Sequence, residues 1–358
     1  MSRVRIDKDV SLSERTTLGL GGRAQYLARA TSDDHVLQAV RHASDRGMPL
    51  ALLAGGSNTL VPDEGFRGLV LSMETEGIHT DTLPDGRALL RVKAGTPWPE
   101  VVRHAVGADL AGLECLAGIP GSAGATPVQN VGAYGQEVSE TIVSVRALDR
   151  RTLDEVVVGG EDCGFRYRDS RFKQDPHAFI VLEVAFALRP GGAPSLRYAE
   201  LERALAGTVR PTLQQVHDTV IALRRAKGMV LDPDDVDSRS AGSFFTNPIV
   251  TASEAARVVE RALSEGLVQT AEAVPRWEQA DGSVKLAAGW LIERAGVRRG
   301  LRRGPVGVSS KHALALVHHG DGTMRELLAL ADEIAGAVHG AFGVALTREP
   351  QLLTGVVA

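Results

Sequence analysis

The chain has 358 residues, more than a single hydrophobic core usually holds, which predicts two or three domains. Its 40 basic and 44 acidic residues give a net charge of −4, which disfavours a nucleic-acid-binding or membrane-surface protein. Hydrophobic residues make up 44% of the chain and charged residues 23%, as in ordinary folded, soluble proteins.

Residues 1–77 are expected to form the first unit, a compact arrangement in which strands alternate with a helix. The helix is indicated by apolar residues at helical spacing, namely Val36, Leu37, Val40 and Ala43. The Thr-Ser pair at 31–32 can cap its N-terminus. Buried strands are predicted over 50–54 and 68–73, and the glycine-rich turn 55–58 follows the first of them.

Residues 78–227 are expected to form the second unit. Strands are predicted over 89–92, 141–148, 154–158 and 179–187, and helices after Thr96 and over 212–226. Between these elements lies the long loop 117–135, whose sequence AGIPGSAGATPVQNVGAYG is rich in glycine. A loop of this length inside a compact protein usually has a function, because ordinary connections have about 4–6 residues.

Residues 228–340 are expected to form the third unit, while residues 341–358 return to the second. The elements expected first are the turn 242–248 (GSFFTNP), a helix near 252–265, an amphipathic run over 285–295 and a strand over 312–318. Thr323 and Glu326 match a capping box, which predicts the start of a long helix. A last strand is predicted at 344–346.

The two cysteines, Cys115 and Cys163, stand in unrelated contexts and form no CxxC pair. This pattern disfavours a disulfide scaffold and a zinc site, and it fits a reducing compartment. The segment 1–10 lacks the apolar core of a signal peptide, and no apolar run approaches the roughly 20 residues that span a bilayer. We therefore expect a cytoplasmic protein that is not embedded in a membrane and holds no metal.

Both glycine-rich loops have the composition of an anion-binding site. Residues without a side chain let backbone N–H groups approach an anion, and short polar side chains add donors. Residues of this kind are Gly55, Gly56, Ser57 and Asn58 in the first loop and Gly118, Gly121, Ser122, Gly124, Ala125 and Thr126 in the second. Two such loops in adjoining units could hold a pyrophosphate between them; the alternative is that each is only a tight structural connection.

The segment from Gly19 to Ala24 matches G-x-G-x-x-A, the dinucleotide-binding fingerprint. That fingerprint requires a buried strand before it and a helix after it. The preceding residues 11–17 are polar, so we interpret the match as a coincidence.

Three polar residues stand in unusual surroundings. Arg168 belongs to the segment 165–173, where four cations alternate with aromatic rings, and its planar guanidinium suits carboxylates and phosphates; a solvated turn is the alternative. Ser243 lies between a glycine and two phenylalanines, without the G-x-S-x-G pattern of a hydrolase nucleophile. Its hydroxyl could donate a proton in a dry site or only cap a turn. Glu349, close to the C-terminus, reads by itself as a surface carboxylate.

Together, the motifs resemble those of the UDP-N-acetylenolpyruvoylglucosamine reductases (the MurB family) over nearly the whole chain. The matching segments, in order, are TTLGLGG, GGSN, IPGSAGATPVQNVGAYG, YRDSRFK, AGSFFTNP, DGSVKLAAGWLIERAG and the terminal REP. Each segment alone is a weak signal, but the ordered set is specific. Residues 188–210 and 228–240, between the motifs, look variable.

The resemblance implies an α+β fold. Two domains related to vanillyl-alcohol-oxidase-type flavoproteins would hold FAD non-covalently, and a third α+β domain would bind substrate. FAD would contact the ten loop residues named above together with Pro120, Gln129, Asn130, Gly132, Ala133 and Tyr134. Tyr198 and the chain length before GSFF match the family's type I branch.

The implied reaction reduces UDP-N-acetyl-3-O-(1-carboxyvinyl)-glucosamine to UDP-N-acetylmuramate, with NADPH as reductant, in peptidoglycan precursor synthesis. Hydride would pass from NADPH to FAD and then from flavin N5 to C3 of the substrate. Ser243 would protonate C2 as general acid, while Arg168 and Glu349 would stabilise the enolate-like charge. The residues that the resemblance places at the substrate are Tyr198, Arg224, Lys227, Asn247 and Lys285. A monomer without nucleic-acid or membrane partners is expected.

Two other functions stay open. Another FAD-dependent oxidase of the same superfamily, acting on an alcohol or hydroxy acid, would share the FAD loops but would not need Ser243 and Glu349 in these contexts. A non-catalytic UDP-sugar-binding protein that keeps the fold would purify without flavin colour. Reduction of bound flavin by NADPH distinguishes both from the reductase.

Overall fold

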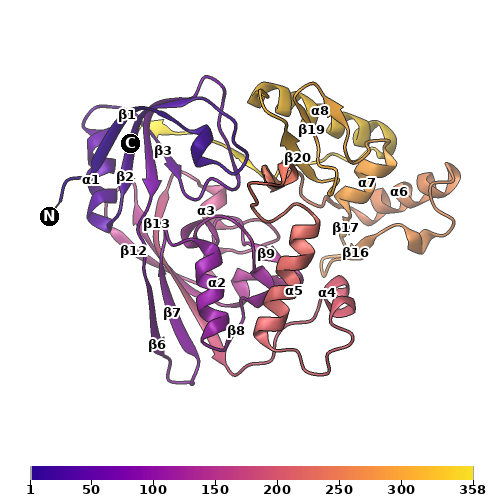
Figure 1. Cartoon of the computed structure of the whole chain (residues 1–358), viewed down its shortest axis with the longest axis horizontal. Coiled ribbons are helices and arrows are strands. Elements are labelled where there is room, and N and C mark those ends of the chain that lie inside the picture. The colour runs from indigo at the N-terminus through magenta and orange to yellow at the C-terminus, as the bar shows by residue number, and fades with distance from the viewer. Residues whose placement is uncertain (1, 358) are drawn as a thin grey trace.

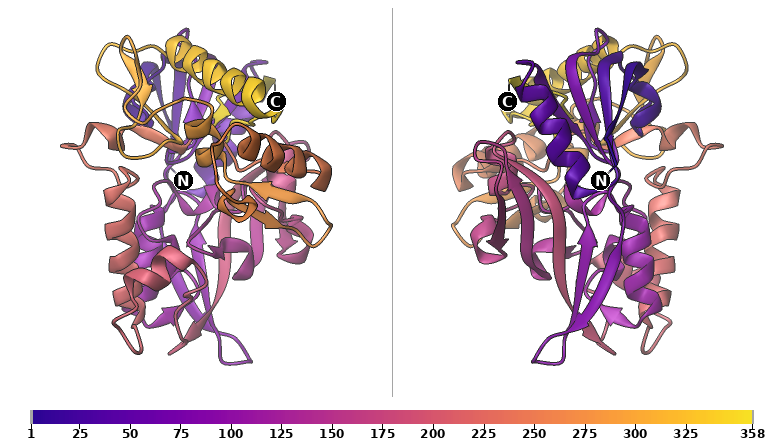
Figure 2. Two further views of the ribbon diagram at one scale, coloured as in Figure 1. Left: turned by 90° about the vertical axis from the view of Figure 1, so that its right-hand side faces the viewer. Right: turned by 90° about the vertical axis from the view of Figure 1, so that its left-hand side faces the viewer.

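The computed structural model describes residues 2–357, which form three groups of strands and helices (Figure 1). A five-stranded sheet with α1 lies at the upper left of Figure 1, and a six-stranded sheet lies below it. The orange and golden segments at the right, which include α6, α7 and α8, form the third group. Figure 1 shows the yellow C-terminal strand beside the first sheet, and the right view of Figure 2 shows the indigo helix α1 next to the strands of that sheet. Within residues 2–357, no helix is long and apolar enough to cross a membrane.

The five-stranded sheet has the order β1-β2-β5-β3-β22, and its three central strands are parallel. Its strands are β1 (Arg5–Ser11), β2 (Arg23–Ala30), β3 (Pro49–Leu53), β5 (Phe66–Met73) and β22 (Val356–Val357). α1 (Asp33–Ser44) begins after Ser32, whose hydroxyl accepts a hydrogen bond from the N–H of His35. Its apolar face packs with Leu50 and Leu69 of the sheet, as the helical spacing predicts.

The second sheet is antiparallel, with the order β12-β11-β13-β7-β6 and a short strand β8 paired to β13. Its strands are β6 (Ile78–Thr82), β7 (Ala88–Lys93), β8 (Leu110–Ala111), β11 (Ile142–Asp149), β12 (Glu155–Gly159) and β13 (Phe179–Pro190). α2 (Trp98–Gly107) and α5 (Leu213–Ala226) share one hydrophobic core with this sheet. The predicted strands and helices of residues 78–227 are therefore confirmed.

The third group holds two smaller sheets, with the orders β14-β20-β19-β18 and β15-β17-β16. The strands are β14 (Ser240–Ser243), β15 (Ile249–Val250), β16 (Arg276–Glu278), β17 (Val284–Leu286), β18 (Arg302–Arg303), β19 (Val306–Val308) and β20 (Ala315–His318). The helices are α6 (Ala252–Ser264), α7 (Ala288–Arg294) and α8 (Met324–Phe342). α8 begins with the predicted capping box of Thr323 and Glu326. It buries an apolar face against β19 and β20.

Three expectations for the C-terminal part are wrong. Residues 344–346 form no strand; instead β21 (Gln351–Leu352) and β22 pair with β4 (Thr59–Leu60) and β3. The tail therefore returns to the first sheet and not to the second. The strand expected over 312–318 starts only at Ala315, after a turn. The amphipathic run 285–295 contains the end of β17 and the whole of α7. The division of the chain at residues 77 and 227 stays a prediction.

The dinucleotide fingerprint is excluded by its surroundings. The segment Gly19 to Ala24 follows a short 3-10 helix (Ser13–Arg15) and runs into β2, so it has neither the strand before it nor the helix after it. A Cβ at Gly21 would lie 2.4 Å from the Cβ of Val61, which shows that this glycine serves close packing.

Candidate active site

A cavity of about 390 Å³ lies where the two glycine-rich loops meet. Leu50, Leu52 and Ala54 line it along β3, because side chains two residues apart on a strand point to the same face. The loop residues that line it are Ser57, Asn58, Pro120, Gly121, Ser122, Gly124, Ala125, Thr126, Gln129 and Gly132. Arg168, Ser243 and Glu349 line the same cavity, so three polar residues far apart in the sequence come together here.

Gly55 and Gly56 lie behind the wall of this cavity. A Cβ at Gly55 would lie 2.6 Å from the Cα of Gly121, and one at Gly56, whose φ is +61°, would lie 2.0 Å from a backbone carbonyl oxygen. The Ser57 hydroxyl donates a hydrogen bond to the carbonyl oxygen of Pro120 at 3.0 Å. Gly55 therefore lets the two loops meet, whereas Gly56 lets the first loop pass close to the backbone of Arg15. Residues 57 and 58 are the ones that face the cavity.

Four other residues predicted to bind the cofactor do not line the cavity, namely Gly118, Asn130, Ala133 and Tyr134. Asn130 is 1% exposed, and its side chain holds the loop itself. Its amide donates to Glu137 Oε2 at 2.8 Å, and its Oδ1 accepts from the N–H of Ser139 at 3.1 Å. A glycine-rich motif thus contains residues that shape the loop as well as residues that face a ligand.

Arg168 and Glu349 form a half-buried ion pair, with 3.2 Å between Arg168 Nε and Glu349 Oε1. The Arg168 guanidinium also donates to the carbonyl oxygens of Gly132, at 2.6 Å, and Asn130, at 3.3 Å. Burial raises the pKa of Glu349, and the nearby Arg168 opposes that rise. The pair places a fixed positive charge, beside a carboxyl group whose pKa is raised, at one wall of the cavity.

Ser243 is brought to this pair by the backbone. β14 ends at Ser243, and the next residue, Phe244, accepts a hydrogen bond from the N–H of Glu349 at 2.9 Å. Phe245 forms a further bridge to Arg348. Within residues 2–357, no protein atom forms a hydrogen bond with the Ser243 hydroxyl, so its proton is available to a ligand in the cavity.

The residues predicted to contact substrate do not form one cluster. Arg224 lines the cavity, and its buried Nε has no hydrogen-bond partner; burial lowers its pKa to about 10. Lys227 lies 5.6 Å from the ring centre of Tyr134, which stacks edge-on against Tyr198. Lys227 directly follows α5, so the Tyr134–Tyr198 pair lies near the C-terminal end of that helix.

Asn247 and Lys285 both lie next to Tyr167, whose hydroxyl accepts a hydrogen bond from the N–H of Asn247 at 3.4 Å. Asn247 lines a second cavity of about 600 Å³, which Tyr167 and Arg168 also line. Its Oδ1 accepts a hydrogen bond from the N–H of Ala288 at 2.9 Å, at the start of α7. Lys285 Nζ lies 4.9 Å from the Tyr167 ring centre. These positions keep the substrate roles of Asn247 and Lys285 as predictions.

The sequence analysis missed Arg150, which lines the cavity at the N-terminal end of β3. Its side chain is 8% exposed, Nη2 donates to the carbonyl oxygen of Leu50 at 3.4 Å, and its buried Nε has no partner. Burial lowers its pKa. In the sequence, Arg150 stands in the polar turn between two strands and looks like a solvated residue, so no signal marked it.

His312 is a second residue that sequence reasoning missed. Burial lowers its pKa to about 4, and the neighbouring Lys227, Arg299 and Arg224 act in the same direction. Its Nδ1 accepts a hydrogen bond from the N–H of Leu314 at 3.0 Å. His312 is therefore a neutral imidazole at pH 7 and sits close to the cations near the end of α5.

We expect His312 to make the protein less stable below pH 6.5. An unfolded histidine has a pKa of about 6.5, whereas burial holds that of His312 at about 4. Between these values the unfolded state binds the extra proton, so stability is complete above pH 6.5 and is lost as the pH falls toward 4. Urea unfolding at pH 7.5 and 5.5 measures this loss. The His312→Gln variant should show a smaller loss, and an equal loss in both proteins would contradict the expectation.

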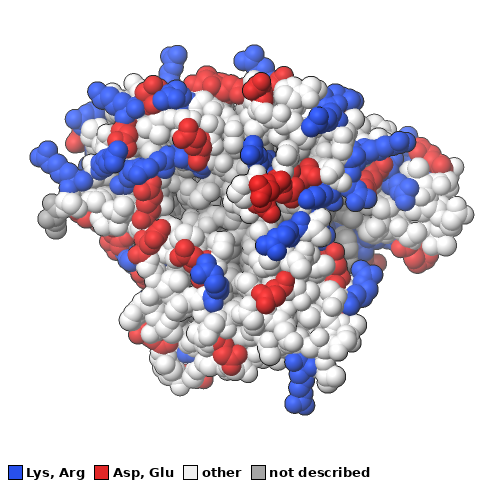
Figure 3. All heavy atoms as spheres, in the orientation of Figure 1, with Lys and Arg blue, Asp and Glu red and all other residues white. Residues whose placement is uncertain are grey.

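The charges of the cavity fit an extended dianionic ligand. On the face drawn in Figure 3, basic and acidic side chains are interspersed. The charged residues that line the cavity are instead four cations and one carboxylate, namely Arg150, Arg168, Lys173, Arg224 and Glu349. Ser122 Oγ, Arg150 Nε and Arg224 Nε are buried donors without partners in the part of the chain described. Unpaired buried donors are costly, so a ligand with several acceptors along its length, such as FAD, suits this cavity.

The sequence matches two family models. Residues 233–353 match the model described as UDP-N-acetylenolpyruvoylglucosamine reductase, C-terminal domain, and residues 24–152 match the model described as FAD binding domain. The two matches cover the third group of elements and most of the first two sheets.

Curated relatives match over nearly the whole chain. The UDP-N-acetylenolpyruvoylglucosamine reductase of Streptomyces coelicolor is 49% identical over 96% of this chain and 88% of its own. That of Thermobifida fusca is 45% identical over 97% of both chains. The crystal structure of the reductase from Thermus caldophilus aligns with a TM-score of 0.65 and 24% identity, over 98% of this chain and 99% of that one, which shows a shared fold.

Proposed function

Since the chain belongs to the UDP-N-acetylenolpyruvoylglucosamine reductase family, we propose that it reduces the enolpyruvyl group of UDP-N-acetylenolpyruvoylglucosamine with NADPH and bound FAD. One observation carries the proposal: Arg168, Ser243 and Glu349, which come from three distant segments, line a cavity bounded by both glycine-rich loops. The expected α+β FAD-binding fold with a third domain agrees with the matched models and with the related crystal structure.

The loops and cations of the cavity would hold FAD. Ser57, Asn58 and the small residues of loop 117–135 would surround its pyrophosphate with backbone donors, and Arg150 lies at the far end of the cavity. When bound and reduced by NADPH, FAD supplies the hydride that goes to C3 of the enolpyruvyl group. The protein's own side chains would stabilise the charge that develops and donate the proton.

Charge develops on C2 and on the attached carboxylate as C3 receives hydride. The Arg168 guanidinium, held in place by two carbonyl oxygens and by Glu349, would stabilise that charge without reorganising, since it is already oriented. The Ser243 hydroxyl would then give its proton to C2. Serine is a weak acid, so this transfer requires the strongly basic carbon and the absence of bulk water.

An anaerobic stopped-flow experiment tests the function. The purified protein is mixed first with NADPH and then with the enolpyruvyl substrate, while flavin absorbance is recorded. Bleaching by NADPH and recovery on adding substrate are expected. A flavin that NADPH does not bleach would favour an oxidase of the same superfamily. A flavin that NADPH bleaches but the enolpyruvyl substrate does not restore, or a colourless protein that takes up no FAD, would refute the proposal.

We expect Arg150 to recognise the adenosine half of FAD. β3 separates Arg150, beside Leu50, from the loop 55–58, while Ser243 and Glu349 lie near the loops. Replacing Arg150 by methionine should weaken FAD binding to the apoprotein about 10- to 100-fold, the usual effect of losing a hydrogen bond to a charged group, and leave FMN binding unchanged. Flavin fluorescence quenching measures both affinities.

The control for this prediction is Arg151→Met, because Arg151 is the exposed neighbour of Arg150 in the same turn. It should bind FAD as the wild type does. If Arg150→Met weakened FMN and FAD binding by the same factor, Arg150 would act on the fold of the cavity and not on the adenosine.

We also propose that the protein works as a monomer in the cytoplasm. The net charge of −4 and the lack of a spanning helix in residues 2–357 are consistent with this. Sedimentation velocity at working concentration tests the monomer, since a dimer would sediment distinctly faster.

A further inference from the structure

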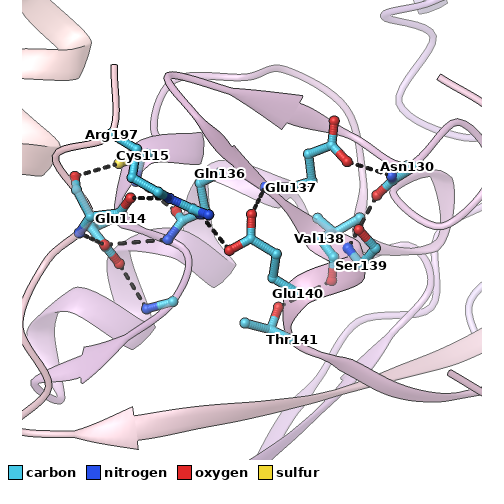
Figure 4. A network of polar contacts seen from close by, with 12 residues as sticks. Glu114, Cys115, Asn130, Gln136, Glu137, Val138, Ser139, Glu140, Thr141 and Arg197 are labelled. Atoms are coloured by element: carbon cyan, nitrogen blue, oxygen red, sulfur yellow. Dashed lines mark hydrogen bonds and ion pairs between the residues drawn. The ribbon is translucent and has the colours of Figure 1, made fainter. Parts of the chain in front are cut away.

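Glu114 is a carboxylate that no step proposed above uses. It is 1% exposed and lies in a short 3-10 helix (Glu114–Leu116) beside the loop 117–135. Its Oε2 accepts from the N–H of Gly112 at 2.8 Å, and its Oε1 accepts from the N–H of Ser195 at 2.8 Å and from Gln136 Nε2 at 3.3 Å. Figure 4 shows Glu114, Gln136 and Arg197 side by side.

These contacts hold the backbone at Ser195 from both sides. While Glu114 accepts from its N–H, the Cys115 thiol donates to its carbonyl oxygen at 3.3 Å. Burial, with the charge of Glu114 as a smaller cause, raises the pKa of Cys115 to about 12, so the thiol keeps its proton and stays a donor. The N–H of Cys115 in turn donates to Gln136 Oε1 at 3.0 Å, which closes the network.

Arg197 links the same segment to Glu140, which lies shortly after the loop 117–135. Its Nε donates to the Ser195 hydroxyl at 3.1 Å, and its Nη2 pairs with Glu140 Oε2 at 2.5 Å (Figure 4). Glu140 is itself fixed, because its Oε1 accepts from the N–H of Glu137 at 3.1 Å. Ser195 and Arg197 are thus both held to residues on either side of the loop 117–135, namely Glu114, Cys115 and Glu140.

The held segment ends at Tyr198, the residue before α4 (Ala199–Ala204). The Tyr198 ring is 44% exposed and stacks edge-on against Tyr134, with ring centres 5.3 Å apart. On the other side of Tyr134 lies Lys227, which pairs with Glu200 of α4 at 2.5 Å. The position of Tyr198 therefore depends on the anchor at Ser195, three residues earlier.

A carboxylate suits this place better than an amide. Glu114 accepts three hydrogen bonds, from donors that belong to three separate segments. A glutamine offers one acceptor oxygen, and its NH₂ would face a backbone N–H, which leaves at least one buried donor unpaired. Within residues 2–357, Glu114 forms no ion pair, since Arg197 pairs with Glu140, so these three donors are the partners of the buried carboxyl group.

We propose that Glu114 is a positioning residue that sets Tyr198 over the substrate by anchoring residues 195–198. This inference rests on the proposed function and on the contact with the UDP-sugar substrate that the family resemblance implies for Tyr198. It adds a residue that touches neither substrate nor cofactor, and it predicts an effect on one half of the reaction only.

The test compares Glu114→Gln with wild type in the two half-reactions. We expect KM for the enolpyruvyl substrate to rise about tenfold and the melting temperature to fall, because a buried donor loses its partner, while the rate of flavin reduction by NADPH and the FAD content stay unchanged. Tyr198→Ala should raise KM by a similar factor. The double variant should show no further rise, because both changes remove the same contact. Glu202→Gln, an exposed carboxylate change on α4, is the matched control.

Additive effects of Glu114→Gln and Tyr198→Ala would overturn the proposal, and so would a wild-type KM in Glu114→Gln. If Glu114→Gln does not fold, Arg197→Ala replaces it, because Arg197 is exposed and its loss removes the second fastening. Arg197→Ala should also raise KM and be non-additive with Tyr198→Ala, and additivity there would refute the inference. A wild-type protein that fails to turn over the substrate at all refutes the proposed function instead, so the two failures are distinct.

Discussion

Replacing Ser243 by alanine is expected to slow the transfer of hydride and proton to the enolpyruvyl substrate about 10²- to 10⁴-fold, the usual contribution of a general acid. The reduction of bound flavin by NADPH should keep its wild-type rate. The reason is geometric: the Ser243 hydroxyl lines the cavity beside the Arg168–Glu349 pair and has no hydrogen-bond partner in residues 2–357. Its proton is free for C2, and alanine has none to give.

Stopped-flow absorbance separates the two half-reactions of the Ser243 variants. Ser243→Cys should retain part of the second half-reaction, because a thiol is a stronger acid than an alcohol and occupies the same place. Equal slowing of both half-reactions in Ser243→Ala would mean that Ser243 supports the shape of the cavity and does not supply the proton.

Replacing Arg168 by methionine should slow the second half-reaction about 10²- to 10³-fold, the effect of removing one oriented donor from developing charge. The methionine keeps an unbranched apolar stem but leaves Glu349 without its partner 3.2 Å away. The loss should therefore appear with the enolpyruvyl substrate and not with NADPH.

Arg168→Lys is the informative comparison. Lysine keeps the charge, but its three donors share one nitrogen, whereas Arg168 uses Nε, Nη1 and Nη2 for Glu349, Asn130 and Gly132. We expect a rate between those of the methionine variant and the wild type. If lysine restored the full rate, charge alone would suffice and the fixed orientation of Arg168 would play no part.

Local patterns in the sequence predicted much of the secondary structure. The helical spacing around Val36 and the capping box at Thr323 are properties of short segments, and both helices form where expected. β1 and β2 were not predicted, because β1 holds only two apolar residues, Ile6 and Val10, with three charged residues between them, and β2 mixes arginine with alanine. β1 pairs with β2, and the pairing of β2 with β5 depends on residues farther along the chain.

The motifs identified the family, but they did not distinguish residues within a motif. In the loop 117–135, Ser122 faces the cavity, whereas Asn130 turns away to hold the backbone. Both stand in equally glycine-rich surroundings. Which of them faces a ligand depends on the direction of each peptide, and Asn130, with a φ of +46°, takes a direction that a sequence pattern does not reveal.

By itself, the sequence determined the α+β elements, the two glycine-rich loops and the identity of Arg168, Ser243 and Glu349 as candidates, because each depends on local composition or on an ordered set of motifs. Only the tertiary structure decided that the C-terminal tail pairs with β3 and that the buried Arg150 faces the cavity. It also decided that Glu114 holds Ser195. The physical reason is that strand pairing and the burial of a charge depend on contacts between residues up to some hundreds of positions apart, and local sequence carries little information about them.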